Sequence, residues 1–254
     1  MICTGTSGLS ITEIAEYYDP FYRQCVIGMH FFNPPYQMVL CEMIPTVYTN
    51  LEKFNEIIMY CKSILHRTTV VVKDSPAFLA NRIGFYFINR ALQLAEEYKY
   101  SGGIDYIDAI FGPYTGRTMA PMITANFVGL DVLKAIVDNL YKSTNDIVHS
   151  SFLLPNFVNR LVERKYLGKK TGGGLYKTVK NEDNIKTHQV YDIQYDDYRN
   201  VNQYTFSFSL QMVDCIKNGD YKKAFSILED NHSMEAEFCL QELIKYILYS
   251  LNAS

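Results

Sequence analysis

Short apolar runs alternate with amphipathic segments over the first 74 residues of this 254-residue chain. Residues 25–29, 38–44 and 69–72 are apolar runs of strand length, and the last is rich in β-branched side chains. Residues 10–18 and 51–65 repeat apolar side chains at helical spacing, and Ser10 is suited to cap the first of these helices. This alternation predicts an α/β layer with parallel strands over residues 1–74.

Helical spacing dominates after the Lys-Asp-Ser-Pro sequence at 73–76, where Ser-Pro predicts a turn before a helix. The pattern predicts an all-α domain over 75–177, which ends in a glycine-rich basic loop at 168–177. An extension over 178–254 follows. The predicted elements are helices at 77–97, 104–111, 122–140 and 155–165, a hairpin at 189–199, and helices near 207–218, 221–229 and 234–251.

Composition excludes some classes of function. Lys and Arg total 24 against 27 Asp and Glu, a formal net charge of −3, which argues against general nucleic-acid binding. The apolar runs are shorter than a membrane span, and the first residues do not resemble a signal peptide. The six cysteines form no Cys-x-x-Cys pair, so we predict no metal site and expect reduced, buried thiols in a cytoplasmic protein.

The sequence His30-Phe31-Phe32-Asn33-Pro34-Pro35 directly follows the predicted strand at 25–29. A histidine at a strand end lies where open α/β sheets place ligands. Glu42, twelve residues later, is a carboxylate inside an apolar strand, which is costly unless it is paired. The two side chains therefore form a candidate base and its orienting carboxylate, within about 2.6–3.2 Å of each other. A structural histidine with an ordinary hydrogen bond remains the alternative.

Four segments occur in an order and at distances that resemble one enzyme family. They are Thr6-Ser7, the HFFNPP segment with Glu42 after it, KDSPAFLANR at 73–82 and LGKKTGGGLYK at 167–177. Together they resemble the 3-hydroxyacyl-CoA dehydrogenases of fatty-acid β-oxidation, over residues 1–177. Residues 178–254 resemble, more weakly, the segment after the dehydrogenase part of multifunctional hydratase/dehydrogenase fusions. The resemblance implies NAD-dependent oxidation of (3S)-3-hydroxyacyl-CoA to 3-oxoacyl-CoA.

The resemblance also implies roles for individual residues. His30 resembles the catalytic base and Glu42 its partner, while Ser7 and Asn81 resemble substrate contacts. Ser7, Asn33 and Lys170 resemble groups that contact the NAD cofactor. Without the resemblance, Ser7 could be a turn residue, Asn81 a surface amide and Lys170 part of a solvated basic loop.

The chain has no Gly-x-Gly-x-x-Gly turn, the feature that holds a dinucleotide pyrophosphate. Gly5 stands where the family usually has Asn, and Asn126 where Asp is common. We therefore expect residues 1–74 to be the C-terminal remnant of a Rossmann-like NAD-binding domain, in an incomplete or truncated enzyme that binds NAD weakly by itself. Residues 75–177 would be a helical substrate and dimerisation domain, like the C-terminal domain of 6-phosphogluconate dehydrogenase.

The expected partners are an acyl-CoA substrate and either a second copy of the chain, as a homodimer, or a chain that supplies the missing cofactor half. The alternatives are a non-catalytic helical interaction module and a truncated pseudoenzyme.

Overall fold

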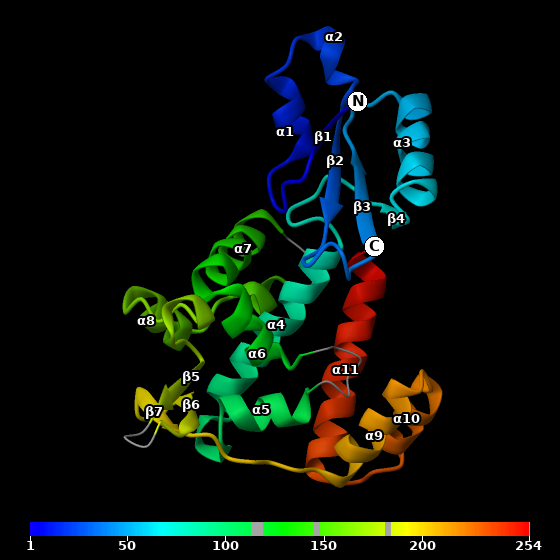
Figure 1. The fold of residues 1–254 in the computed structure, drawn as a ribbon. Coiled ribbons are helices and arrows are strands. Elements are labelled where there is room, and N and C mark those ends of the chain that lie inside the picture. The colour runs from blue at the N-terminus through cyan, green and yellow to red at the C-terminus, as the bar shows by residue number, and fades with distance from the viewer. Residues whose placement is uncertain (113–118, 145–147, 181–183, 254) are drawn as a thin grey trace. The chain divides into compact units, whose positions relative to one another are not determined.

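The computed structural model describes residues 1–112, 119–144, 148–180 and 184–253 (Figure 1). The chain divides into two compact units, Met1–Ile83 and Gly84–Asn252. The division falls near the predicted boundary at residue 75, inside a long helix. None of the helices in the described ranges is both long and apolar enough to cross a membrane.

The first unit contains a four-stranded sheet in the order β1-β2-β3-β4. Its strands are β1 (Ile2–Thr4), β2 (Val26–Phe31), β3 (Leu40–Pro45) and β4 (Thr68–Val71). The β1–β2 and β3–β4 pairs are parallel, as predicted, but β2 and β3 are antiparallel. The prediction of an all-parallel layer is wrong there because the β2–β3 connection is too short for the crossover that parallel strands need.

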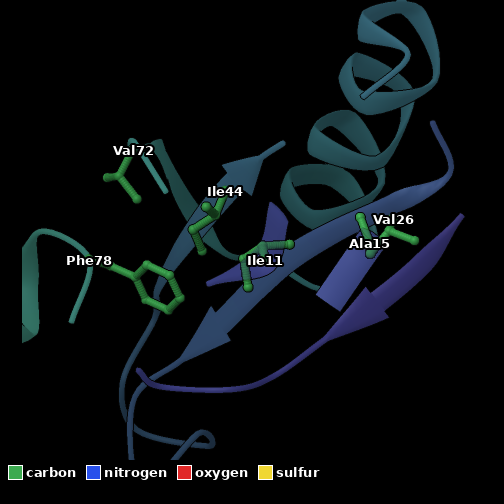
Figure 2. Close-up of a cluster of buried hydrophobic side chains, with 6 residues drawn as sticks. All are labelled: Ile11, Ala15, Val26, Ile44, Val72 and Phe78. Carbon is green, nitrogen blue, oxygen red and sulfur yellow. The ribbon is translucent and has the colours of Figure 1, made fainter. Parts of the chain in front are cut away.

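Helices cover both faces of this sheet. Ser10 caps α1 (Ile11–Glu16) by accepting a hydrogen bond from the Glu13 amide, as its sequence predicts, and Asn50 caps α3 (Leu51–Ser63). A short helix, α2 (Pro20–Arg23), follows α1. Side chains alternate across the strands, so Val26 and Ile44 pack with α1 while Ile27 and Met43 pack with α3. Figure 2 shows the α1 side of this core: Ile11, Ala15, Val26, Ile44, Val72 and Phe78.

The second unit is mainly helical, and α4 (Ala80–Glu97) leads into it from the first. The predicted helix at 122–140 is two helices, α6 (Pro121–Val128) and α7 (Leu130–Ser143), because Gly129 separates them with a φ of 103°. A salt bridge from Arg90 to Glu242 joins α4 to the last helix, α11 (Met234–Ala253), and the Tyr86 ring of α4 stacks on the Tyr249 ring of α11. The first group of elements after α4 is η1 (Lys99–Ser101), α5 (Ile104–Ile110), α6 (Pro121–Val128), α7 (Leu130–Ser143), η3 (His149–Phe152), α8 (Asn156–Glu163) and η4 (Lys169–Thr171).

A three-stranded antiparallel sheet, β5-β6-β7, separates these helices from the last three. The hairpin predicted at 189–199 is present as β6 (Lys186–Asp192) and β7 (Asp197–Asn200). The glycine-rich loop is shorter than predicted, since β5 (Tyr176–Lys180) already begins within it. The last helices are α9 (Ser207–Lys217), α10 (Tyr221–Glu229) and α11 (Met234–Ala253).

The thiols are only partly as expected. Cys41, Cys61, Cys215 and Cys239 are buried, whereas Cys3 is exposed on the edge strand β1. Burial raises the pKa of the Cys41 thiol to about 12. Cys41 adjoins Glu42 in the sequence, and its high pKa makes it a poor nucleophile beside the candidate site.

Candidate active site

His30 and Glu42 face each other across the β2–β3 pair. The antiparallel register sets the two residues directly opposite one another. The His30 Nδ1 atom lies 2.8 Å from Glu42 Oε2, inside the predicted range, and the two residues are 3% and 1% exposed. The buried carboxylate inside the apolar strand is therefore paired, and its partner is the histidine that the sequence indicated.

The second oxygen of Glu42 is held by the backbone at the start of α4. Glu42 Oε1 accepts hydrogen bonds from the amides of Leu79, at 3.1 Å, and Ala80, at 2.7 Å. A carboxylate that accepts hydrogen bonds on both oxygens is fixed in place and is stabilised as an acceptor. It therefore favours the His30 tautomer that carries its hydrogen on Nδ1, which leaves the Nε2 lone pair free to accept a hydrogen.

Ser7 lies at the other side of the His30 ring. Its hydroxyl is 3.1 Å from His30 Nε2, and its carbonyl oxygen accepts a hydrogen bond from the Asn81 side chain at 3.4 Å. Ser7 lies in the exposed loop after β1, while Asn81 is in the first turn of α4. Four of the predicted site residues, Ser7, His30, Glu42 and Asn81, are therefore brought together within the first unit.

Apolar rings surround the imidazole. Phe32 packs edge-on against the His30 ring with 4.6 Å between ring centroids, and the Phe78 ring is 5.5 Å away. Phe78 belongs to the α1 side of the core (Figure 2). Because His30 and Glu42 are themselves buried, the hydrogen bond between them is made in surroundings of low polarity.

Asn33 is exposed in the loop that joins β2 to β3. Sequence reasoning did not identify Arg67, which holds this loop: its Nη1 donates to the carbonyl oxygens of Pro35, at 2.7 Å, and Met38, at 3.1 Å. The Arg67 guanidinium also lies over the Phe31 ring. An isolated arginine after an amphipathic helix gave no sequence signal for this contact, because it depends on the β3–β4 pairing.

Lys170 lies in the second unit, in η4. Its ammonium group is 2.5 Å from a carboxylate oxygen of Asp131, in the first turn of α7, and this hydrogen bond holds the pKa of Asp131 below its usual value. Asn126 accepts a hydrogen bond from the Tyr176 amide, and a Cβ on Gly174 would lie only 2.5 Å from its side-chain oxygen. Asn126 and the glycines thus support the loop that carries Lys170.

Comparisons with known proteins give the family. Residues 1–75 match the model of the 3-hydroxyacyl-CoA dehydrogenase NAD-binding domain, and residues 78–178 match that of its C-terminal domain. The chain is 35% identical over 177 residues to mitochondrial hydroxyacyl-coenzyme A dehydrogenase of Rattus norvegicus, and 35% identical over 179 residues to 3-hydroxybutyryl-CoA dehydrogenase of Clostridioides difficile. These alignments include 70% and 69% of this chain, and 54% and 60% of the relatives.

A solved structure is similar as well. The crystal structure of (S)-3-hydroxybutyryl-CoA dehydrogenase from Ralstonia eutropha superposes with a TM-score of 0.61 at 31% identity, over 68% of this chain and 59% of that one. The chain thus spans little more than half the length of these two curated relatives.

The two family models correct one expectation. Residues 1–75 match the NAD-binding domain itself, so the expectation that the chain lacks most of this domain, and the description of its sheet as a remnant, are not confirmed. The expected combination of a Rossmann-like α/β sheet and a helical domain is consistent with both matches. With the two models matching consecutive segments from residue 1 to residue 178, the chain belongs to the 3-hydroxyacyl-CoA dehydrogenase family.

Proposed function

We propose that this chain carries the catalytic groups for NAD-dependent oxidation of (3S)-3-hydroxyacyl-CoA to 3-oxoacyl-CoA in fatty-acid metabolism. The observation that carries the proposal is the continuous set of hydrogen bonds Ser7–His30–Glu42, which ends on the Leu79 and Ala80 amides. This arrangement presents one basic nitrogen, His30 Nε2, beside a hydroxyl group and fixes the ring from behind. It is the arrangement that a general base requires.

His30 acts on the 3-hydroxyl group of the substrate. Its Nε2 accepts the hydroxyl proton while the hydride on C3 leaves for NAD⁺, and the C3–O bond becomes a carbonyl. Glu42 stabilises the imidazolium that forms, because its Oε2 lies 2.8 Å from Nδ1. In the reverse direction the imidazolium returns its proton to the carbonyl oxygen.

Ser7 and Asn81 are proposed as the substrate contacts. The Ser7 hydroxyl already lies 3.1 Å from His30 Nε2, so a substrate oxygen that reaches Nε2 also comes within reach of Ser7. Asn81 reaches the same loop, through its hydrogen bond to the Ser7 carbonyl oxygen. Both groups donate hydrogen bonds, and these strengthen as negative charge develops on the substrate oxygen.

The residues of the first unit fit the nicotinamide end of NAD. Ser7 and Asn33 follow the carboxyl ends of β1 and β2, which are adjacent and parallel, and this edge is where α/β sheets bind dinucleotides. NAD supplies the hydride acceptor when it is bound. Lys170 is the further proposed contact, and its ammonium group would have to exchange or share its present partner, Asp131.

The proposed domains are 1–74 for the cofactor, 75–177 for substrate and dimerisation, and 178–254 as an extension that begins a second helical segment.

Exposed apolar side chains support self-association through 75–177. Ile123 and Phe127 on α6 are 46% and 60% exposed, and Val132 on α7 is also exposed. We infer that a second copy covers them in a homodimer. Sedimentation tests this: Phe127→Glu should yield monomers, and an unchanged sedimentation coefficient would contradict it.

Activity is tested with the purified full chain. NADH formation from (3S)-3-hydroxybutyryl-CoA and NAD⁺, followed by absorbance, should fall roughly 10²–10⁴-fold in His30→Gln, the usual worth of a general base. His232→Gln, a change at an exposed histidine, is the matched control and should leave turnover unchanged. The proposal would be contradicted by full turnover in His30→Gln, or by a parent chain that shows no turnover in either the oxidation or the reduction direction.

A further inference from the structure

Asp74 makes contacts that the proposed chemistry does not use. It belongs to the Lys-Asp-Ser-Pro sequence between β4 and α4, and its carboxylate contacts the start of α1. Oδ1 accepts a hydrogen bond from the Ile11 amide at 3.0 Å, and Oδ2 accepts from the Thr12 amide at 2.7 Å and from the Ser10 hydroxyl at 3.0 Å. We propose that Asp74 is a positioning residue that holds the Ser7 hydroxyl against His30.

The loop between β1 and α1 transmits this hold. Ser7 lies three residues before Ser10, the N-cap of α1. The Thr6 hydroxyl accepts hydrogen bonds from the Gly8 and Leu9 amides, which makes the loop a tight turn rather than a slack connection. Because α1 has only six residues, it stabilises its own first turn poorly and depends on the carboxylate contacts. A displaced first turn therefore moves Ser7.

The same segment holds the base from the other side. Five and six residues after Asp74, the Leu79 and Ala80 amides donate to Glu42 Oε1. Between them, Ala77 and Phe78 adopt φ values of 59° and 52°, which non-glycine residues rarely adopt, and both are buried. Two consecutive residues in this region persist only where the surrounding packing dictates them.

Phe78 is where that packing is visible. Its side chain lies in the core with Ile11 and Ala15 of α1 (Figure 2), and its ring is 5.5 Å from the His30 ring. Residues 74–80 thus form a bracket: Asp74 fixes α1 and the Ser7 loop, Phe78 fills the space between, and the amides at 79 and 80 fix Glu42. The bracket keeps the Ser7 hydroxyl beside His30 Nε2, while Glu42 holds His30 Nδ1.

This inference rests on the proposed function for its catalytic meaning, but the contact can be tested without turnover. The full chain has five histidines, and selective ¹⁵N labelling of histidine, with His30→Gln for assignment, resolves the His30 ring nitrogens. In Asp74→Asn, the Nε2 signal should shift to the position it has in Ser7→Ala. The Nδ1–H signal of the Glu42 hydrogen bond should remain. The double variant Asp74→Asn/Ser7→Ala should show no further shift.

The control is Asp19→Asn. Asp19 is an exposed carboxylate that caps the neighbouring helix α2 through the Phe21 amide, and it does not reach the Ser7 loop. It should leave both ring nitrogens unchanged. An Asp74→Asn chain that is less stable but keeps the parent Nε2 signal would overturn the proposal, because Asp74 would then serve stability alone. Asp74→Asn is chosen over Asp74→Ala because it keeps one acceptor for the α1 amides and the shape of the side chain.

Turnover gives a second readout. If Asp74 acts through Ser7, Asp74→Asn should lower kcat by the same factor as Ser7→Ala, and the double variant should match the single ones within about twofold, as coupled residues do. Multiplied losses in the double variant would overturn the proposal. If the parent chain shows no turnover, the proposed function fails while the Nε2 signal still decides the role of Asp74.

Discussion

Two substitutions at Glu42 separate its structural role from its catalytic role. Glu42→Ala removes the acceptor for three buried donors: His30 Nδ1 at 2.8 Å, the Leu79 amide at 3.1 Å and the Ala80 amide at 2.7 Å. A buried donor without a partner costs about 1–3 kcal/mol. Some relaxation and water entry follow, so we expect a loss of about 3–5 kcal/mol in the unfolding free energy of the first unit, as for a broken buried pair.

Glu42→Gln is the matched variant. Its Oε1 still accepts from both backbone amides, so we expect a loss of only about 1 kcal/mol. Its amide group, however, donates to His30 Nδ1, which moves the ring hydrogen to Nε2. Nε2 then has no lone pair for the substrate proton. Turnover should therefore fall roughly 10²–10⁴-fold, the range for loss of a general base, in a chain that is still folded.

The chain has no tryptophan, so urea unfolding is followed by far-UV circular dichroism and tyrosine fluorescence. Hydrogen exchange of residues 74–83 reports the Leu79 and Ala80 amides, which should lose protection in Glu42→Ala and keep it in Glu42→Gln. Parent-like stability of Glu42→Ala would refute the burial argument. Parent-like turnover of Glu42→Gln would refute the tautomer argument.

Three further predictions concern the second unit. Burial raises the pKa of the Asp108 carboxyl group to about 7, although hydrogen bonds from the Met122 amide and the Tyr176 hydroxyl act to lower it. The stability that the bound proton contributes is therefore complete below pH 3.8 and is lost as the pH rises through about 7. Asp108→Asn should make the urea midpoint depend less on pH in this range, and an unchanged pH dependence would contradict the prediction. Arg199→Ala should lower the unfolding free energy in urea by about 3–5 kcal/mol, because it removes the cation paired with the buried Asp105 carboxylate. Lys134→Ala removes an exposed pair with Asp138 and should change the unfolding free energy by no more than about 0.5 kcal/mol. Equal effects would show that the Asp105 pair is no stronger than a surface pair. Gly168→Ala should lower the melting temperature more than Gly172→Ala, because both have positive φ but only the Cβ at 168 would lie 2.2 Å from the Asn126 carbonyl oxygen; the reverse order would exclude that clash as the cause.

The sequence alone determined the elements whose signals are local. Periodicity and capping predicted α1, α3 and the hairpin β6–β7 near their actual bounds. These signals are local, because a cap such as Ser10 and a repeat of apolar side chains depend only on residues a few positions away. The spacing of His30 and Glu42 likewise predicted a buried pair, because a carboxylate in an apolar strand must find a partner. The break at Gly129 was missed, since the apolar pattern continues through it.

Only the tertiary structure decided what joins at the site. The antiparallel β2–β3 register sets His30 opposite Glu42, and no periodicity within one strand reports the direction of its neighbour. The contacts of Asp74 with α1 and of the Leu79 and Ala80 amides with Glu42 join segments more than thirty residues apart in the sequence. Such contacts depend on how the core packs around Phe78. That packing brings together residues that are far apart in the sequence, so no local sequence pattern predicts it.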